Sequence, residues 1–198
     1  MMQAFTDAMI DELRGKFTTH KPFPHLLIKN FLSETDAKTL VEALKNEQFE
    51  EKESDLFSFK QTQDLHYSGN KVIKEFVAML ESKEFAEFIK KISDIKVKRG
   101  ALDLSGSLYE DTNYLLCHDD QLEDRKIAYI LYLSDLGKND GGALVLREDS
   151  KGKPSTVVKR YYPDFNSLIL FQVSKQSWHE VEEVLGKKKR YAIGGWLR

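Results

Sequence analysis

Residues 102–108 read L-D-L-S-G-S-L, and this stretch marks the change in texture that decides the fold. Its apolar residues alternate with polar ones, a period of two that is typical of a β-strand with one buried face. From about Lys96 onward such runs recur, separated by turn signals such as Asn139-Asp140-Gly141-Gly142. The further strand-like runs are residues 114–118, 126–133, 143–146, 156–161, 168–173, 180–184 and 190–197. The second half is therefore expected to form a sandwich or barrel of short strands.

The first half of the chain has mainly helical periodicity. Apolar residues recur at helical spacing in residues 5–13, 37–44, 72–80 and 85–92. Ser33 is placed to cap the second of these helices. Residues 23–32 read as a short strand, and Phe57 and Phe59 alternate with polar residues as in another strand. The pattern predicts an α+β chain with helices first and many strands later.

The size and charge of the chain limit its class. Its 198 residues suit one domain, with residues 1–95 as mainly helical support carrying a few strands and residues 96–198 as the strand-rich core. Thirty basic residues against thirty-two acidic ones give a formal charge of -2. We therefore expect no direct nucleic-acid binding and no attachment to an anionic membrane, since both favour a basic face.

Cysteine content and the N-terminal sequence indicate the compartment. Cys117 is the single cysteine, so an intrachain disulfide and a Cys-rich zinc site are excluded. Residues 1–16 include Asp7, Asp11 and Glu12 and do not read as a signal or transit peptide. No run approaches the roughly 18 apolar residues that span a bilayer. We expect a cytoplasmic protein, with the nucleus as a second location in a eukaryotic source.

A candidate metal site lies in residues 114–120, which read Y-L-L-C-H-D-D. Residues two apart on a strand project to the same face, so His118 and Asp120 can converge on one ion while Asp119 points away. His179 lies 59 residues after Asp120, at the edge of a later strand. Two histidines and one carboxylate form the facial triad of non-haem Fe(II) oxygenases, which leaves positions open for a co-substrate and O₂. An H-x-D pair alone is common by chance, so the interpretation depends on a further residue.

Arg190 supplies that residue, eleven positions after His179. A 2-oxoglutarate molecule that chelates iron through its keto acid needs a cation for its far carboxylate, and Arg offers a bidentate pair that Lys cannot match. Arg190 opens the apolar run R-Y-A-I-G-G-W-L, whereas the three lysines before it read as a solvated turn. Tyr109 and Tyr132 are candidate phenol contacts for the same carboxylate, although core packing explains these tyrosines equally well on spacing alone.

Longer motifs give the chain a family resemblance. L-L-C-H-D-D-Q-L-E-D-R-K-I-A-Y-I-L-Y-L, G-G-A-L-V-L, P-D-F-N-S-L-I-L-F-Q-V, S-W-H-E-V-E-E-V and R-Y-A-I-G-G-W resemble the ribosomal prolyl hydroxylases. The resemblance reaches back to L-F-S-F-K-Q-T-Q-D-L and S-K-E-F-A-E-F-I and so covers most of the chain. Members of that family are Fe(II)- and 2-oxoglutarate-dependent oxygenases that hydroxylate a proline of the small-subunit ribosomal protein near the decoding centre.

The resemblance implies a fold, a site and a partner. The fold would be a double-stranded β-helix (a cupin-like jelly roll) with N-terminal helices packed on it. His118, Asp120 and His179 match the iron ligands of the family, and Tyr109, Tyr132 and Arg190 match its 2-oxoglutarate contacts. Trp196 matches an aromatic residue of the same strand and would form a wall of the pocket. The cofactors would be Fe(II), 2-oxoglutarate and O₂, with ascorbate supporting turnover, and the partner would be a proline-containing segment of a protein, most simply a ribosomal protein.

Two departures from the family bear on the substrate and the co-substrate. Animal and fungal members carry a second jelly roll, whereas this sequence stops at Arg198, which puts the identity of the substrate in doubt. Related prolyl hydroxylases often have a hydroxyl residue four positions after the anchoring Arg, where this chain has Gly194. Any additional hydrogen bond to the co-substrate must then come from elsewhere.

Other interpretations of the same residues stay open. The same chemistry could act on another protein, a free amino acid or another small molecule. Nucleic-acid demethylation would call for a basic groove and a second Arg near the anchor, where the chain has Ala192. A jelly-roll binding module without activity would be expected to lack a ligand or the anchor. The polar stretch 61–70 is expected either to cover the substrate channel as a mobile lid or to be an ordinary surface loop.

Overall fold

A computed structural model describes residues 1–122 and 124–198. The helices are α1 (Asp7–Thr19), α2 (Glu34–Lys45), α3 (Lys71–Leu80) and α4 (Lys83–Ser93), with 3-10 turns η1 (Leu65–Tyr67) and η2 (Lys138–Asp140). The strands of the first half are β1 (His25–Ile28), β2 (Phe49–Ser54) and β3 (Phe57–Asp64). The strands of the second half are β4 (Ser105–Tyr109), β5 (Tyr114–His118), β6 (Ile127–Tyr132), β7 (Leu144–Asp149), β8 (Pro154–Tyr161), β9 (Ser167–Gln172), β10 (His179–Val181) and β11 (Arg190–Leu197).

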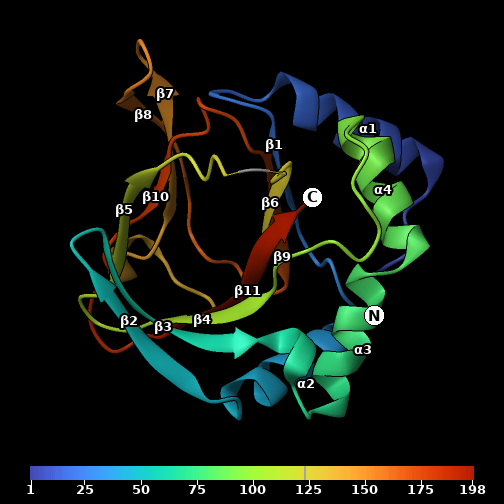
Figure 1. Cartoon of the computed structure of the whole chain (residues 1–198), viewed down its shortest axis with the longest axis horizontal. Coiled ribbons are helices and arrows are strands. Elements are labelled where there is room, and N and C mark those ends of the chain that lie inside the picture. Colours follow the sequence, from blue (N-terminus) through green and yellow to red (C-terminus); the bar gives the residue numbers. More distant parts are fainter. Residues whose placement is uncertain (123) are drawn as a thin grey trace.

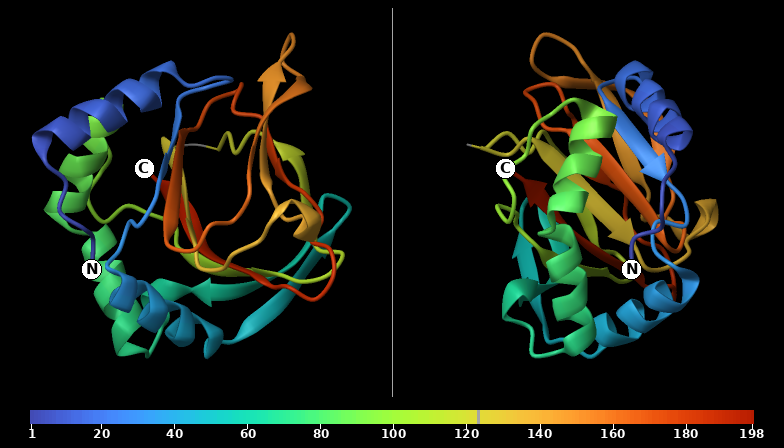
Figure 2. Two further views of the ribbon diagram at one scale, coloured as in Figure 1. Left: turned by 180° about the vertical axis from the view of Figure 1, so that it is seen from behind. Right: turned by 90° about the vertical axis from the view of Figure 1, so that its right-hand side faces the viewer.

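The strands join into one curled antiparallel sheet, and the helices gather on one side of it (Figure 1). The strand order is β1-β9-β6-β11-β4-β3-β5-β10-β7-β8, with β2 paired to β3 outside this path. Strand β3 joins the two halves of the curl, because Lys60 and Gln61 pair with β4 while Phe57 and Ser58 pair with β5. The curled sheet with flanking helices, seen from two further sides in Figure 2, is the double-stranded β-helix expected from the sequence.

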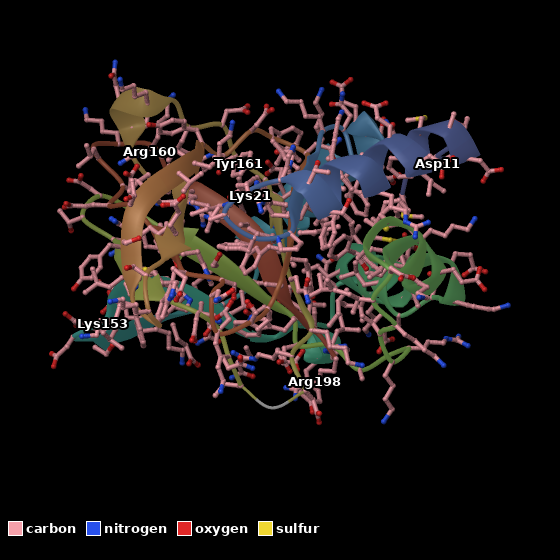
Figure 3. The ribbon with its side chains drawn as sticks, turned by 90° about the horizontal axis from the view of Figure 1, so that it is seen from above. Asp11, Lys21, Lys153, Arg160, Tyr161 and Arg198 are labelled. Carbon is pink, nitrogen blue, oxygen red and sulfur yellow. The ribbon has the colours of Figure 1, made fainter. Side chains whose placement is uncertain are left out.

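The sheet curls until its two edge strands meet. The His25 ring on β1 lies 2.8 Å from the Tyr161 hydroxyl on β8 through its Nε2 atom. Figure 3 labels Tyr161, at the end of β8, and Lys21, which precedes β1, in the view from above. This contact joins residues 136 positions apart and connects the two edge strands of the sheet.

Residues of β9 show why the sheet is buried on both faces beneath the helices. Leu168 and Leu170 belong to the core shared with the helices, whereas Ile169 and Phe171 belong to the core inside the curl. Because neighbouring residues of a strand point to opposite faces, a strand between two cores must be apolar throughout. The four central residues of β9, L-I-L-F, meet that demand, and the first five residues of the strand are buried.

Helix starts follow the local chemistry of the sequence. The Ser33 hydroxyl accepts a hydrogen bond from the Asp36 N–H at 3.1 Å and caps α2 as predicted. Thr6, Asn70 and Ser82 cap the other helices through side-chain oxygens in the same way. None of the helices in the described ranges is long and apolar enough to cross a membrane.

The structure departs from the sequence prediction in the first half. Strand β2 was not predicted, because F-E-E-K-E-S has one apolar residue and no alternation. Strand β3 continues to Asp64 although residues from Gln61 onward read as a polar loop. Pairing with both β2 and β4 satisfies the backbone there and overrides the weak local propensity. Strand β1 is shorter than the predicted range 23–32.

Candidate active site

Three side chains that could bind a metal meet at the mouth of the curled sheet. His118 ends β5 and His179 begins β10, and the two residues are partners in the antiparallel register. The His118 Nε2 atom lies 3.2 Å from Asp120 Oδ1, and His179 Nε2 lies 3.3 Å from Asp120 Oδ2. One ligand atom from each residue lies within 4.8 Å of the others. The structure thus brings together the two histidines and the carboxylate that the sequence singled out.

Asp120 reaches this position by a different route from the one that strand alternation predicts. Strand β5 ends at His118, and Asp120 lies beyond it with a φ of 60°. A positive φ is uncommon outside glycine, although Asp tolerates it better than most residues. The chain therefore turns at Asp120, and the turn brings the carboxylate back between the two imidazoles. Asp119 points away, as expected, and its Oδ1 accepts the Gln121 N–H at 3.0 Å.

The backbone orients both imidazoles. His118 Nδ1 lies 2.9 Å from the Leu116 carbonyl oxygen, and His179 Nδ1 lies 2.7 Å from the Ser177 carbonyl oxygen. A carbonyl oxygen can only accept, so in both rings Nδ1 donates a proton to the backbone. Both Nε2 atoms face Asp120, where they donate to the carboxylate when protonated and can bind a cation once that proton is lost. This is the ring orientation that metal-bound histidines use.

Ser177 connects the two segments that carry the triad. Its side chain is fully buried, and its Oγ lies 2.8 Å from the Asp119 carbonyl oxygen and 2.7 Å from the Ser174 carbonyl oxygen. A hydroxyl has one proton, and the Ser174 oxygen already accepts the Ser177 N–H. We therefore assign the hydroxyl proton to Asp119, whose carbonyl belongs to the peptide just before Asp120. Ser177 thus binds the peptide between Asp119 and Asp120 through its hydroxyl. It binds the His179 ring through its carbonyl oxygen.

Trp196 and Arg125 complete the surroundings of Asp120. The Trp196 indole N–H donates to Asp120 Oδ2 at 2.9 Å, and the Arg125 guanidinium stacks 3.4 Å above the indole ring. Burial alone would raise the pKa of the Asp120 carboxyl, but the hydrogen bonds and charges of the two histidines outweigh it. The net effect holds that pKa well below its usual range. Asp120 is therefore a carboxylate, the form that binds a cation.

A buried cation lies at the other end of the same pocket. Arg190 begins β11 and is 1% exposed, while the three lysines before it are exposed. Its Nε donates to the Gly142 carbonyl oxygen at 3.0 Å, and its guanidinium stacks at 4.9 Å on Tyr109 and 5.1 Å on Tyr132. Within residues 1–122 and 124–198, Arg190 Nη2 and the Tyr132 hydroxyl have no hydrogen-bond partner. Buried polar groups without partners are costly, so these atoms are suited to a bound anion.

The two tyrosines beside Arg190 are hydrogen-bond donors rather than charges. Burial raises the pKa of Tyr109 to about 12, against a smaller opposing effect of Arg190. Burial also raises the pKa of Tyr132, and Arg190 again opposes it. Both phenols therefore stay neutral near pH 7. A neutral phenol and a guanidinium together match the oxygens of a carboxylate.

One pocket connects the triad to the buried cation. Its lining includes His118, Asp120, His179, Tyr109 and Arg190. The remaining walls are largely apolar or aromatic and include Phe59, Leu115, Ala128, Leu144, Phe171, Val181 and Trp196. Trp196 thus forms a wall of the pocket, as the resemblance implied, and it also contacts Asp120 directly.

Close packing against the neighbouring strand explains why position 194 is a glycine. A Cβ atom at this position would lie 2.8 Å from the Tyr129 carbonyl oxygen, closer than real Cβ contacts. The neighbouring strand therefore leaves no room for the hydroxyl residue of related enzymes. Ser105, Ser107 and Gln61 line the same pocket and carry the polar groups that sequence reasoning did not single out. The polar residues of 102–108 gave the only signal, since they occupy one face of a strand.

The polar stretch 61–70 is not a free loop. Gln61 to Asp64 belong to β3, Leu65 to Tyr67 form η1, and Asn70 caps α3. Gln61 lines the pocket, and its side-chain N–H donates to the Ser105 hydroxyl at 2.9 Å. The leading edge of the stretch therefore faces the pocket from a strand.

Comparison with known proteins defines the class first. Residues 104–198 match the family model of the 2OG-Fe(II) oxygenase superfamily. The fold is similar to that of a Pseudomonas putida prolyl-4-hydroxylase, with a TM-score of 0.76 at 18% identity over 96% of this chain and 98% of that one. It is also similar to a Trichoplax adhaerens prolyl hydroxylase in complex with a hypoxia-inducible-factor peptide fragment, with a TM-score of 0.73 at 16% identity over 98% and 94% of the chains. These structures show the fold, which is that of a 2-oxoglutarate oxygenase.

Sequence relatives with higher identity match most of the chain. The chain is 40% identical over 180 residues to prolyl 3-hydroxylase OGFOD1 of Xenopus laevis, covering 89% of this chain and 35% of that protein. It is 34% identical over 195 residues to prolyl 3,4-dihydroxylase OGFOD1 of Ostreococcus tauri, covering 89% of this chain and 38% of that protein. Over most of its length the chain is thus similar to these prolyl hydroxylases, and it spans about a third of their length.

Proposed function

We propose that this chain is an Fe(II)- and 2-oxoglutarate-dependent dioxygenase that hydroxylates a prolyl residue of a protein. His118, Asp120 and His179 would bind the iron, and Arg190 would bind the far carboxylate of 2-oxoglutarate together with Tyr132 and Tyr109. The observation that carries the proposal is a His-Asp-His cluster and a buried, incompletely paired Arg190 at two ends of one pocket. A metal-binding module without a co-substrate would have no use for such a cation.

The residues present fit both groups. Two neutral imidazoles and one carboxylate are the donor set of non-haem Fe(II) oxygenases. The free Arg190 Nη2 and the Tyr132 hydroxyl can satisfy a carboxylate that the apolar walls alone would exclude. When bound, Fe(II) and 2-oxoglutarate supply the oxidising chemistry, in which O₂ is consumed, succinate and CO₂ form, and one oxygen atom goes to the substrate.

The chain itself contributes position and exclusion of water. Leu116 and Ser177 carbonyls fix the two imidazole rings, and Trp196 fixes one oxygen of Asp120. Phe171 lies 4.6 Å from the His179 ring and shields it from solvent on the inner side. A site held in this way needs little reorganisation when ligands arrive.

The protein substrate is the finer part of the proposal. The relatives are named prolyl hydroxylases, and one solved structure of similar fold holds a protein-derived peptide. These names support a prolyl residue in a polypeptide. Together with the motif resemblance of the sequence, they favour a small-subunit ribosomal protein over a free amino acid. A chain that acts on such a substrate would be cytoplasmic.

A peptide assay tests the proposed function. Proline-containing peptides of ribosomal proteins are incubated with enzyme, Fe(II), 2-oxoglutarate and ascorbate and then measured by mass spectrometry. We expect a gain of one oxygen on proline with wild-type enzyme and none with His179→Ala. Succinate above the level of that variant without any peptide oxidation would keep the oxygenase and reject the prolyl substrate.

A further inference from the structure

The pocket continues into a groove along β3. Gln61, Ser105 and Trp196 line both the pocket and a second hollow beside it. Asp64 lines that second hollow and also a third, which extends to Tyr67 at the η1 turn. We call the second and third hollows together the β3 groove. In Figure 1 the end of β3 points toward α3.

Side chains of the β3 groove offer hydrogen bonds rather than a strand edge. Strand β3 is paired with β2 on one side and with β4 on the other, so its backbone near Gln61 cannot take up an additional strand. Amide side chains face the groove instead, from Gln61 beside the pocket and from Gln48 and Gln63 farther along. Such amides can pair with both the N–H and the C=O groups of an extended polypeptide.

The far end of the β3 groove is acidic. Glu47 Oε1 accepts the Ser68 hydroxyl proton at 2.7 Å, and Asp64 Oδ1 lies 2.5 Å from His66 Nδ1. Asp103, at the near end, is instead compensated by a two-point contact with Arg198 at 2.8 and 3.0 Å. Among the described residues that line the two hollows there is no Lys or Arg. The groove therefore favours a cationic side chain near Glu47 and Asp64.

Tyr67 adds an apolar surface at the same end. Its side chain is 83% exposed, and it lines the third hollow beside Glu47 and Asp64. An exposed aromatic face next to carboxylates suits the methylene stem and the charge of Lys or Arg. Gln61 pairs with Ser107 and Asp64 pairs with Ser105, so a bulge in β3 leaves the two residues separated by about two strand positions, or about 7 Å. A cation at Asp64 would thus be about two to three extended residues from a group held beside Gln61.

We propose that the β3 groove binds the polypeptide flanking the reacting residue and selects a Lys or Arg two to three positions from it. This inference rests on the proposed function, because it places the prolyl residue in the pocket beside Gln61. It makes the protein substrate a basic, extended segment and assigns its recognition to Glu47, Asp64 and Tyr67.

Paired peptides test the β3 groove. Each pair contains one proline and differs only in Lys or Gln at one position, which is moved from two to six residues away on either side. For wild-type enzyme we expect kcat/KM to favour Lys at one such distance by roughly three- to tenfold, through KM, as two partly exposed charge contacts would give. The preference should fall as ionic strength rises.

Conservative variants identify the residues responsible. Glu47→Gln with Asp64→Asn keeps the hydrogen bonds to Ser68 and to the His66 N–H and removes both charges. We expect the Lys-to-Gln ratio of kcat/KM to approach one. The matched control is Glu51→Gln with Glu53→Gln, which removes two charges from β2 opposite Lys60 and Ser58 and should keep the preference.

The outcomes separate the β3 groove from the proposed function. Equal kcat/KM for the Lys and Gln peptides at every distance would overturn the proposed selection of a basic residue by the β3 groove. A preference that survives in Glu47→Gln with Asp64→Asn would overturn it as well. If no peptide is oxidised, the proposed function fails, and fluorescence anisotropy of the same labelled peptides then decides the groove. Tighter binding of the Lys peptide to wild type, with this preference lost in the double variant, would support selection by the groove. Equal binding of the Lys and Gln peptides by both proteins would overturn it.

Discussion

The two ends of the pocket differ in how their buried charges are compensated. At the metal end, Asp120 is surrounded by His118, His179 and Trp196, so its charge has partners even without a cation. At the anchor end, Arg190 is buried against two neutral phenols and has one nitrogen without a partner in the part of the chain that the structure describes. The charge at the metal end is therefore compensated without an ion. The guanidinium at the anchor end is fully hydrogen-bonded only when an anion binds.

This difference separates affinity from selectivity. Any divalent ion that accepts two imidazoles and a carboxylate can occupy the metal end, because geometry and availability rather than raw affinity decide the metal. The anchor end is demanding, since a planar guanidinium and a phenol require a carboxylate at a fixed distance from the metal. Variants at the metal end should therefore lose metal binding. Variants at the anchor end should instead raise the KM for 2-oxoglutarate.

The largest effect is expected at the metal end. His179→Ala removes one of three ligands and should abolish both metal binding and turnover, because two ligands cannot hold the ion in an open site. Metal content after dialysis and succinate release give the readouts. His66→Ala removes a histidine from the η1 turn and should retain both; turnover by His179→Ala equal to wild type would refute the assignment of the triad.

At the anchor end, Arg190→Lys should raise the KM for 2-oxoglutarate by about 10- to 100-fold, the value of one lost charge-assisted contact. Metal affinity should stay within about twofold, since the anchor does not touch the triad. Steady-state kinetics and Mn(II) titration measure the two effects separately. Lys187→Met, in the exposed turn before Arg190, serves as the control, and an unchanged KM in Arg190→Lys would place the co-substrate elsewhere.

A third variant returns to the metal end with a smaller expected effect. Ser177→Ala removes the hydroxyl that binds the Asp119 carbonyl and should weaken metal affinity about tenfold, in the range known for residues that orient metal ligands. Binding of 2-oxoglutarate to the metal-loaded protein should change less. Ser174→Ala, in the same turn, loses only its hydrogen bond with Gln176 and should bind metal as wild type does. Equal metal affinities for Ser177→Ala and Ser174→Ala would show that the Ser177 hydroxyl does not position the metal ligands.

The last effect is on the free energy of unfolding and concerns the contact between the two edge strands of the sheet rather than either end of the pocket. Burial is the main reason that the pKa of His25 is lowered to about 4 from its ordinary 6.5. The unfolded chain therefore binds more protons between these values, and the free energy of unfolding should fall as pH falls from about 6.5 to about 4, by at most about 1.4 kcal/mol per pH unit. His25→Gln should flatten this part of the denaturation profile. A profile identical to wild type would mean that His25 is free to protonate in the folded protein.

The sequence predicted the parts of the molecule that local pattern determines. Arg190 was distinguished from its neighbouring lysines because it begins an apolar strand, and it is buried while they are exposed. Ser33 was recognised as a helix cap from its residue type and position. The double-stranded β-helix followed from the strand-like runs together with the family motifs, and the relatives and solved structures agree with it.

What the sequence did not predict depends on distant contacts. The left-handed turn at Asp120 is held by Ser177, which lies 58 residues from Asp119. Strand β2 has no apolar alternation and exists because β3 pairs with it. The contact between His25 and Tyr161 joins the two edges of the sheet across 136 positions. None of these pairs has a signal in local periodicity, because each is a property of the closed fold.

Isotope labelling tests the central claim most directly. Wild-type enzyme is incubated with a proline peptide, Fe(II) and 2-oxoglutarate under ¹⁸O₂, and both products are analysed by mass spectrometry. The account predicts one labelled oxygen in the hydroxyproline and one in succinate, in equal amounts, with neither label in His179→Ala and strongly reduced labelling in Arg190→Lys at low 2-oxoglutarate. Hydroxyproline formed without label in succinate, or equal labelling in His179→Ala, would contradict a 2-oxoglutarate-dependent reaction at this site.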